Sequence, residues 1–255
     1  MGSLMTQISE AQRGRTTPEM KQVARDEHLE YTLIRKQVAS GHIAIPWNPC
    51  HAPKPVGIGK GLRVKVNANI GTSREYCKVR EEVEKARVAV DAGAHAVMDL
   101  STGGDLDSIR KALLKKVRVP FGTVPVYQAG IEAIEKHGSI VDMTEDDMFS
   151  VFEKQAKQGV DFAVVHVGIT KESVERLRKQ KRLIPMVSRG GSFHMAWILH
   201  HEQENPLYEN FEYLLEIAKT YDITLSLGDG MRSGALYDSN DRAKFQELLI
   251  IGELV

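Results

Sequence analysis

Short apolar segments alternate with amphipathic segments through most of the chain. From about residue 61 onward, each apolar segment is rich in β-branched residues and is followed by helical periodicity, which is typical of βα units in a parallel sheet. The apolar segments are hydrophobic on both faces, as expected for strands that helices cover on both sides. The predicted strands are Arg63–Asn69, His95–Leu100, Pro120–Val126, Phe162–Val167, Ile184–Ser188 and Ile223–Leu227.

Amphipathic periodicity predicts a helix after most of these strands. In one of them, Asp147 follows Thr144 at the spacing of a capping box, which favours a helix start. The predicted helices are Arg74–Ala92, Leu106–Lys116, Thr144–Gln158, Lys171–Lys181, Leu207–Thr220 and Asp241–Leu254.

The first sixty residues follow a different pattern, without alternating strands. Thr17 and Pro18 predict a helix with a capping threonine and proline at its first position, and residues 27–40 predict a second helix that stops at Gly41. Residues 51–61 are rich in proline and glycine, so we expect a linker there. The sequence therefore predicts an N-terminal helical domain with its linker over residues 1–60 and an α/β domain over residues 61–255.

Polar residues gather where the predicted strands end. Six polar carboxyl ends in succession favour a (β/α)8 TIM-type barrel, because the loops at that face of a barrel converge on one pocket. The chain supplies about six βα units of the eight that close a barrel, so we expect an incomplete barrel. An open, doubly wound sheet is the alternative. The polar segments are Asn67–Gly71, Met98–Gly103, Pro125–Gln128, His166–Gly168, Ser188–Ser192 and Gly228–Arg232.

The composition narrows the class of protein. The chain is 42% hydrophobic and 27% charged, with 34 basic and 34 acidic residues, so no overall charge attracts nucleic acid or anionic lipid. Cys50 and Cys77 are its two cysteines. They exclude a disulfide framework, and they are too few for a cysteine-ligated zinc or iron–sulfur site built from this chain alone.

The sequence contains few candidate targeting signals. No apolar run approaches the roughly 20 residues that span a bilayer, and no secretory signal is evident, so we expect no membrane partner and a cytoplasmic protein. The first residues, Met1–Thr6, match the short pattern for N-myristoylation, and an extra leader before a native start at Met5 explains them at least as well.

Two strand ends carry residues suited to an anionic ligand. In Ser188–Ser192, glycines allow close backbone approach, helix-start N–H groups favour an anion, and Arg189 can contact phosphate oxygens. A tight βα turn with a solvated arginine explains the same segment. Asp229 and Arg232 suit a polar phosphorylated ligand, whereas an internal ion pair that braces the loop is the alternative.

Three more polar residues are candidates for ligand contact. His166 ends an apolar strand, and Asn69 and Tyr127 lie at other strand ends. Each can orient a ligand, or can form structural hydrogen bonds. The HExxH, GxSxG, Walker and CxxC motifs are absent, which argues against hydrolases. A phosphosugar aldolase or isomerase would need a strand-end lysine or paired carboxylates, and Lys65 is the one weak candidate.

Five of these segments together resemble the thiamin pyrimidine synthase family, also called the phosphomethylpyrimidine synthase (ThiC) family. The resemblance runs in order from about Ala11 to Val255. It is carried by Lys65–Ser73, Val97–Gly104, Gly122–Ala129, Val187–Ser192 and Leu227–Arg232.

The resemblance implies a radical S-adenosylmethionine lyase of thiamine biosynthesis. Such an enzyme converts 5-aminoimidazole ribotide to hydroxymethylpyrimidine phosphate, with a 4Fe-4S cluster and zinc as further cofactors and commonly as a homodimer. The resemblance assigns no catalytic residue and no metal ligand to this chain. It implies that substrate is bound by Asn69, Met98, Tyr127, His166, Ser188, Arg189, Gly190, Asp229 and Arg232.

The product and the activity of the chain have alternatives. A sister group, the 5-hydroxybenzimidazole synthases of anaerobic cobamide assembly, uses the same substrate. Ser233-Gly234 after Arg232, together with Ile45–Pro49 and His166–Gly168, departs from the usual pyrimidine synthase pattern. In the family, a later segment carries the last barrel strands and the cluster-binding cysteines. We therefore expect the 255 residues alone to be inactive, and a non-catalytic ribotide-binding fragment is a further alternative.

Overall fold

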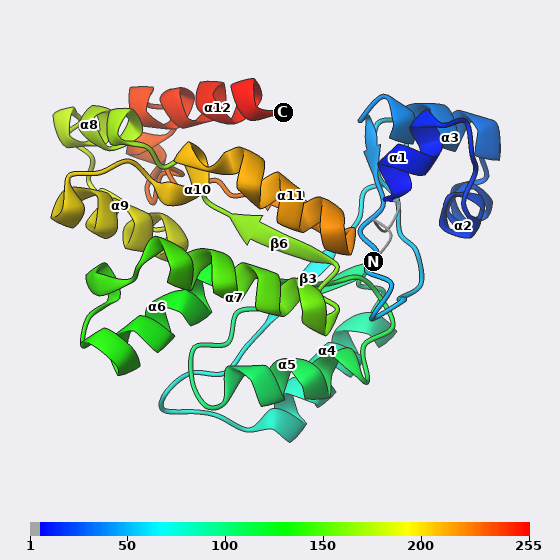
Figure 1. Ribbon diagram of the computed structural model, residues 1–255, viewed down its shortest axis with the longest axis horizontal. Helices are drawn as coiled ribbons and strands as arrows, with labels where there is room; N and C mark the ends of the chain where they lie inside the picture. Colours follow the sequence, from blue (N-terminus) through cyan, green and yellow to red (C-terminus); the bar gives the residue numbers. More distant parts are fainter. Residues whose placement is uncertain (1–5) are drawn as a thin grey trace. The chain divides into compact units, whose positions relative to one another are not determined.

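The computed structural model describes residues 6–255 (Figure 1). The myristoylation pattern at Gly2 lies outside the described residues. The chain divides into two compact units. The first comprises the residues up to Thr123 together with Glu153–Ala163 and Glu216–Leu225, and the second comprises Val124–Phe152, Val164–Leu215 and Ser226–Val255.

Helices open the first unit, as predicted. They are α1 (Gln7–Gln12), α2 (Pro18–Glu27) and α3 (Tyr31–Ala39). The Thr17 hydroxyl accepts a hydrogen bond from the backbone N–H of Met20, and Pro18 is the first helical residue, so the predicted start is confirmed. The predicted helix over residues 27–40 starts too early, since Glu27 ends α2. Apolar residues of the three helices form a small core that includes Met20, Ile34 and Val38.

A short antiparallel pair follows, which the sequence did not predict. Strand β1 (Ile43–Ala44) pairs with β2 (Ile58–Gly59), and the second lies in the segment that we interpreted as a linker. Each strand has only two residues, which is too short to give a recognisable alternation. The predicted domain boundary at residue 60 stays a prediction.

The main sheet is parallel and has five strands in residues 6–255, one fewer than predicted. Their order in the sheet follows the order in the chain, β3-β4-β5-β6-β7. Asn67 pairs with Ala96, Val97 with Phe121, and Gly122 with Phe162. The strands are β3 (Asn67–Ile70), β4 (Ala96–Asp99), β5 (Phe121–Thr123), β6 (Phe162–Val165) and β7 (Thr224–Leu227).

The predicted strand Ile184–Ser188 is wrong, because loop contacts use its backbone groups. The N–H groups of Leu183 and Ile184 donate to the buried carboxylate of Asp238, and the guanidinium of Arg182 donates to the carbonyl of Pro185. Proline has no N–H to give to a sheet. Ile184 and Val187 of this segment are also exposed, at 41% and 42%.

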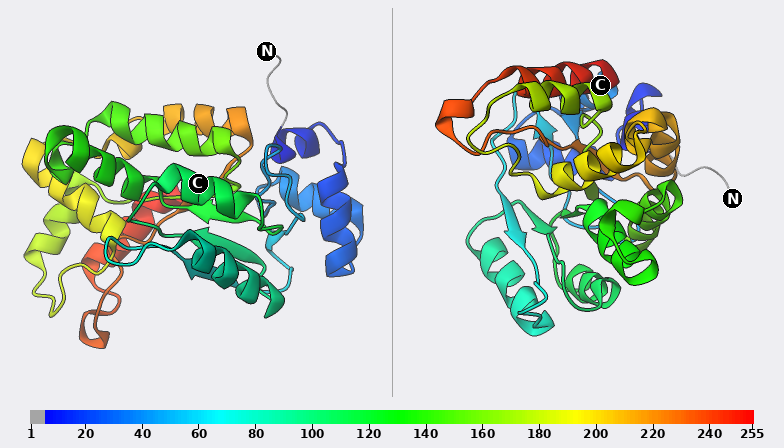
Figure 2. Two further views of the ribbon diagram at one scale, coloured as in Figure 1. Left: turned by 90° about the horizontal axis from the view of Figure 1, so that it is seen from below. Right: turned by 90° about the vertical axis from the view of Figure 1, so that its left-hand side faces the viewer.

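Helices connect the strands, and α4 and α5 lie side by side, as do α8 and α12 (Figures 1 and 2). The reciprocal bonds between Thr144 and Asp147 confirm the predicted capping box. The helices are α4 (Val79–Asp91), α5 (Leu106–Leu114), α6 (Pro125–His137), α7 (Glu145–Gln158), α8 (Lys171–Lys179), α9 (Arg189–His201), α10 (Pro206–Glu209), α11 (Phe211–Tyr221) and α12 (Arg242–Leu254), with 3-10 turns η1 (Ile140–Asp142) and η2 (Leu236–Asp238).

One further strand prediction and one helix prediction need correction. The apolar run Pro120–Val126 predicts one strand, but β5 ends at Thr123 and α6 starts at Pro125, so Tyr127 lies in the first turn of a helix. The predicted helix Leu207–Thr220 is two helices, α10 and α11, with Asn210 between them. None of the helices in residues 6–255 is long and apolar enough to cross a membrane.

A buried polar cluster holds the first unit together. His51 Nδ1 lies 2.6 Å from Asp161 Oδ2, and His51 Nε2 lies 2.9 Å from the carbonyl oxygen of Val117. The Asp161 carboxylate also accepts from the backbone N–H groups of Asn48 and Phe121. Although burial opposes protonation, the hydrogen bond and charge of Asp161 raise the pKa of His51 above its ordinary value. Every polar group of this pair therefore has a partner.

Candidate functional site

The start of helix α9 is the centre of the candidate site in the second unit. Ser188 caps the helix, and its hydroxyl oxygen accepts a hydrogen bond of 3.1 Å from the N–H of Gly191. Ser188 and Gly190 are buried, whereas Arg189 is exposed. The partial positive charge of a helix start, with a cationic side chain beside it, is suited to an anion.

Aromatic residues support Arg189. Its guanidinium carbon lies 4.9 Å from the centre of the Tyr127 ring, which is the geometry of a cation–π contact. Tyr127 in turn meets Phe193 edge to face, with ring centres 6.1 Å apart. Helix α6 and helix α9 thus hold the arginine at the helix start.

His166 lies beside the same helix start, immediately after β6. Its side chain is 4% exposed, and its Nε2 atom lies 3.3 Å from the hydroxyl oxygen of Ser188. A Cβ atom on Gly190 would stand 2.2 Å from the imidazole, and one on Gly228 would stand 3.0 Å from it. Two glycines therefore make the space that this ring occupies.

Burial and nearby charge set the protonation of these groups. Burial, together with the Arg232 cation, lowers the pKa of His166 to about 4, so the imidazole is neutral at pH 7. Burial raises the pKa of the Tyr127 hydroxyl above its ordinary value, against the opposing effect of the Arg189 and Arg232 cations. The site thus presents neutral hydrogen-bonding groups beside two fixed positive charges.

The loop after β7 brings Asp229 and Arg232 to this unit. The guanidinium of Arg232 donates to the backbone carbonyl oxygen of Asp229, while the Asp229 carboxylate pairs with Lys244 at 3.1 Å. Arg232 thus contacts the backbone of Asp229, whereas the Asp229 carboxylate pairs with Lys244. Both side chains are exposed.

Sequence reasoning missed the residues that hold these loops in place. The Glu247 carboxylate accepts from the N–H groups of Gly230 and Met231 at 2.7 and 2.8 Å, and burial raises its pKa to about 7. The Asn205 amide donates to the carbonyls of His166 and Ile169, and its oxygen accepts from the N–H of Leu207. The Asn205-Pro206 pair signals a helix cap, but nothing in the sequence signals the contact with His166.

Asn69 and Met98 belong to the first unit. They are direct neighbours in the register of β3 and β4, so their side chains share one face of the sheet. The Asn69 amide oxygen accepts a hydrogen bond from Asn67 at 2.9 Å. The structure therefore brings Asn69 and Met98 together as one pair. It gathers Tyr127, His166, Ser188, Arg189 and Gly190 at α9, and Asp229 and Arg232 on the loop after β7.

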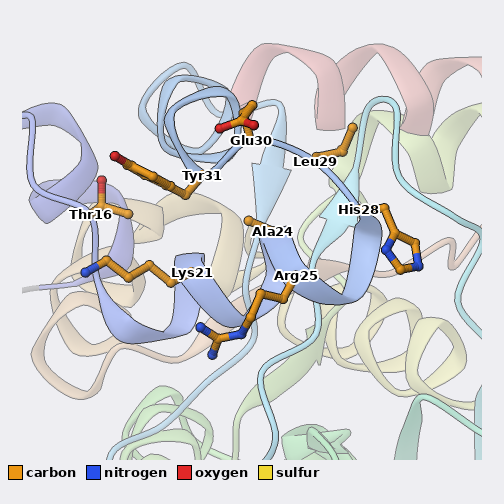
Figure 3. A pocket seen from close by; sticks show the side chains of 8 residues that line it. All are labelled: Thr16, Lys21, Ala24, Arg25, His28, Leu29, Glu30 and Tyr31. Carbon is orange, nitrogen blue, oxygen red and sulfur yellow. The ribbon is translucent and has the colours of Figure 1, made fainter.

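The first unit has a cavity of about 680 Å³ between α2 and α3 (Figure 3). Lys21, Arg25 and His28 supply its basic groups, and Glu30 lies on the opposite wall. No strand end contributes to it, and its lining side chains come from α2, the first residue of α3 and the turns beside them. Its chemistry is that of a solvated surface, so it is not the candidate site.

The described residues do not fit the metal cofactors that the resemblance implies. Cys50 and Cys77 are both exposed, and neither forms a disulfide. A four-iron cluster of this type needs three thiolates. Within residues 6–255, no group of three or more His, Cys, Asp or Glu side chains is arranged to hold a metal ion.

Comparison with known proteins gives the family directly. The model of the radical SAM ThiC family matches residues 6–255. The phosphomethylpyrimidine synthase of Methanocaldococcus jannaschii is 54% identical over 251 residues, and that of Desulforudis audaxviator is 57% identical over 252. These matches cover 98% of this chain, and 59% and 58% of the two relatives. The chain thus spans about three fifths of the curated relatives that it matches, and it belongs to the radical SAM ThiC family.

Proposed function

We propose that this chain forms part of a phosphomethylpyrimidine synthase and binds 5-aminoimidazole ribotide through the candidate site. The observation that carries the proposal is the gathering of Ser188, Arg189, Tyr127 and His166 at the start of α9. A phosphate, a ribose and an imidazole ring need a cationic anion site beside neutral hydrogen-bonding groups. The family match supports the same substrate.

The residues at the start of α9 bind the phosphate in this proposal. Arg189 offers a forked donor that matches phosphate oxygens, and the ring of Tyr127 holds it over the helix start. Ser188 and Gly190 let the phosphate approach the backbone closely. The neutral imidazole of His166 contacts the ribotide through its ring, since its lowered pKa keeps it uncharged.

The remaining predicted residues bind the other parts of the ribotide. Asp229 accepts hydrogen bonds from hydroxyl or amine groups, and Arg232 contacts an anionic oxygen. We propose that Asn69 and Met98, paired across β3 and β4, contact the sugar or the ring. These side chains contribute to the reaction by confining and orienting the substrate.

We also propose that the five described strands belong to a (β/α)8 barrel, preceded by a helical domain over residues 1–60, and that the enzyme is a homodimer. The cytoplasmic location stays a prediction. S-adenosylmethionine, the cluster and zinc are cofactors of the proposed enzyme, but no step through them follows from these residues. Because two cysteines cannot supply three thiolates, we propose that the 255 residues alone do not catalyse the reaction.

Calorimetric titration of the chain with 5-aminoimidazole ribotide tests the binding proposal. Replacing Arg189→Gln removes a charge-assisted contact to phosphate, so the affinity falls about 10- to 100-fold. The matched control is Arg178→Gln, which removes an exposed arginine of α8 in the same unit. Equal loss in both variants, or no binding to the unchanged chain, contradicts the proposed site.

Ser233-Gly234 after Arg232 keeps 5-hydroxybenzimidazole synthase as a second candidate with the same substrate. Mass spectrometry of the products from an enzyme that also carries the cluster-binding segment decides between the two. A pyrimidine phosphate supports the first proposal, and a benzimidazole supports the second. A chain that binds the ribotide tightly but yields neither product in that enzyme supports a non-catalytic binding role.

A further inference from the structure

Two buried histidines meet at a small cavity behind the candidate site. His194 lies on α9, two turns from the cap residue Ser188, and its side chain is fully buried. The rings of His166 and His194 have centres 6.1 Å apart. Both line a cavity of about 10 Å³, whose other walls are apolar side chains such as Met148, Phe152 and Val165. A volume of this size is about that of one water molecule.

The ring nitrogens at this cavity have no partner within the protein. His166 Nδ1 and both nitrogens of His194 are buried without a hydrogen bond. A buried polar group without a partner destabilises the fold, so a bridging molecule is favoured there. Burial lowers the pKa of His194 to about 3, and therefore both rings are neutral at pH 7. Each neutral ring has one donor nitrogen and one acceptor nitrogen.

The cap of α9 favours one position for the hydrogen of the His166 ring. The Ser188 hydroxyl oxygen already accepts from the N–H of Gly191, and its own hydrogen needs an acceptor because Ser188 is 1% exposed. His166 Nε2, at 3.3 Å, is that acceptor. The hydrogen of the neutral ring then lies on Nδ1, which needs an acceptor of its own.

We propose that His194 is a positioning residue, which holds His166 in the Nδ1–H tautomer through one water molecule bound in the cavity between the two rings. The water accepts from His166 Nδ1 and donates to the acceptor nitrogen of His194. The chain of hydrogen bonds then runs from His194 through His166 to Ser188 and the start of α9. It fixes the direction of the Ser188 hydroxyl at the phosphate site, and in this respect the inference rests on the proposed function.

Ring nitrogen NMR of the chain, labelled with ¹⁵N in its histidines and recorded at pH 7 without ligand, tests the inference. In the unchanged chain, His166 is expected to show a protonated Nδ1 and an unprotonated Nε2. His194→Phe fills the cavity and removes the acceptor, so the two nitrogen signals of His166 shift toward a mixture of tautomers. His194→Gln keeps an amide acceptor and restores the Nδ1–H tautomer.

The control is His200→Gln, an exposed histidine on the same helix, which leaves the His166 signals unchanged. An Nε2–H tautomer in the unchanged chain overturns the inference, and this outcome needs no variant to fold. An unaltered tautomer in His194→Phe also overturns it. Since the spectra are recorded without ribotide, a failure of ribotide binding leaves this test intact and counts against the proposed function alone.

Discussion

Both units of this chain bury histidines, and His51 of the first unit and His166 of the second have opposite surroundings. In the first unit, both ring nitrogens of His51 meet an oxygen atom, and the facing Asp161 carboxylate has further backbone donors. In the second unit, His166 has one distant hydroxyl neighbour and an unpartnered nitrogen. Complete pairing marks His51 as structural. Incomplete pairing within the protein, beside two arginines, marks His166 as part of the candidate site.

Electrostatics separates the two regions in the same way. The Asp161 charge favours the protonated form of His51, whereas burial favours the neutral form of His166. A histidine whose protonated form is favoured by a fixed carboxylate cannot exchange that partner without losing pairing energy. A neutral ring can donate from one nitrogen and accept at the other.

The largest expected effect is in the structural pair. Replacing Asp161→Ala leaves His51 and two backbone N–H groups without their acceptor, so the free energy of unfolding should fall by about 3–5 kcal/mol. Urea denaturation followed by circular dichroism measures it. The control Glu175→Ala removes an exposed acid of α8 and should leave the midpoint unchanged. If Asp161→Ala has an equally small effect, the first region is not the structural one.

A smaller effect is expected from overfilling the space beside His166. A Cβ atom on Gly190 would press on the buried ring, so Gly190→Ala should lower stability by about 1–3 kcal/mol. Gly252→Ala is the matched control, because Gly252 lies in α12 with no atom near its added methyl group, and alanine there should raise stability by up to about 1 kcal/mol. Thermal unfolding of both variants measures the contrast. Equal stability would show that the ring has room to move.

The pH dependence of stability gives the most subtle distinction. The pKa values of His166 and His194, about 4 and 3, lie below the ordinary 6.5, so the unfolded chain binds more protons and stability falls as pH drops below 6.5. Each contributes a slope of up to about 1.4 kcal/mol per pH unit. The raised pKa of His51 acts in the opposite direction, and its contribution is lost as pH rises above 6.5 through its folded pKa.

His194→Gln isolates this contribution between pH 6.5 and 4. The variant should lose stability less steeply than the unchanged chain, by up to about 1.4 kcal/mol per pH unit. Glu247, with a pKa raised to about 7, stabilises the fold as pH falls, but it is common to both proteins and cancels in the difference. Urea midpoints across the pH range measure the slopes. A slope identical to that of the unchanged chain would mean that His194 is not buried in neutral form.

Local signals in the sequence predicted the elements that depend on local chemistry. Thr17 with Pro18, and Thr144 with Asp147, are caps whose hydrogen bonds span a few residues, and the structure has both. Ser188 also caps a helix where a helix start was expected. The alternation of apolar segments predicted a parallel sheet, because both faces of such strands are buried.

Local sequence patterns could not predict the elements that depend on distant partners. The segment Ile184–Ser188 has strand composition, but Asp238, more than fifty residues later, accepts from the N–H groups of Ile184 and of Leu183 just before the segment. The apolar run ending in Val126 has strand composition as well, yet Pro125 starts a helix there. Likewise, Glu247 and His194 take part in the candidate site through contacts with residues distant in the chain, which no local spacing indicates.

The amide of Asn205 orders the backbone to which a ligand of the second unit would bind. By holding the carbonyls of His166 and Ile169 and the N–H of Leu207, it fixes the backbone after β6 before any ligand arrives. A ligand at His166 therefore orders little main chain, and the entropy of loop closure contributes little to its affinity. Discrimination between similar ligands at this ring should consequently arise from enthalpy and shape, with adjustment confined to the exposed arginine side chains.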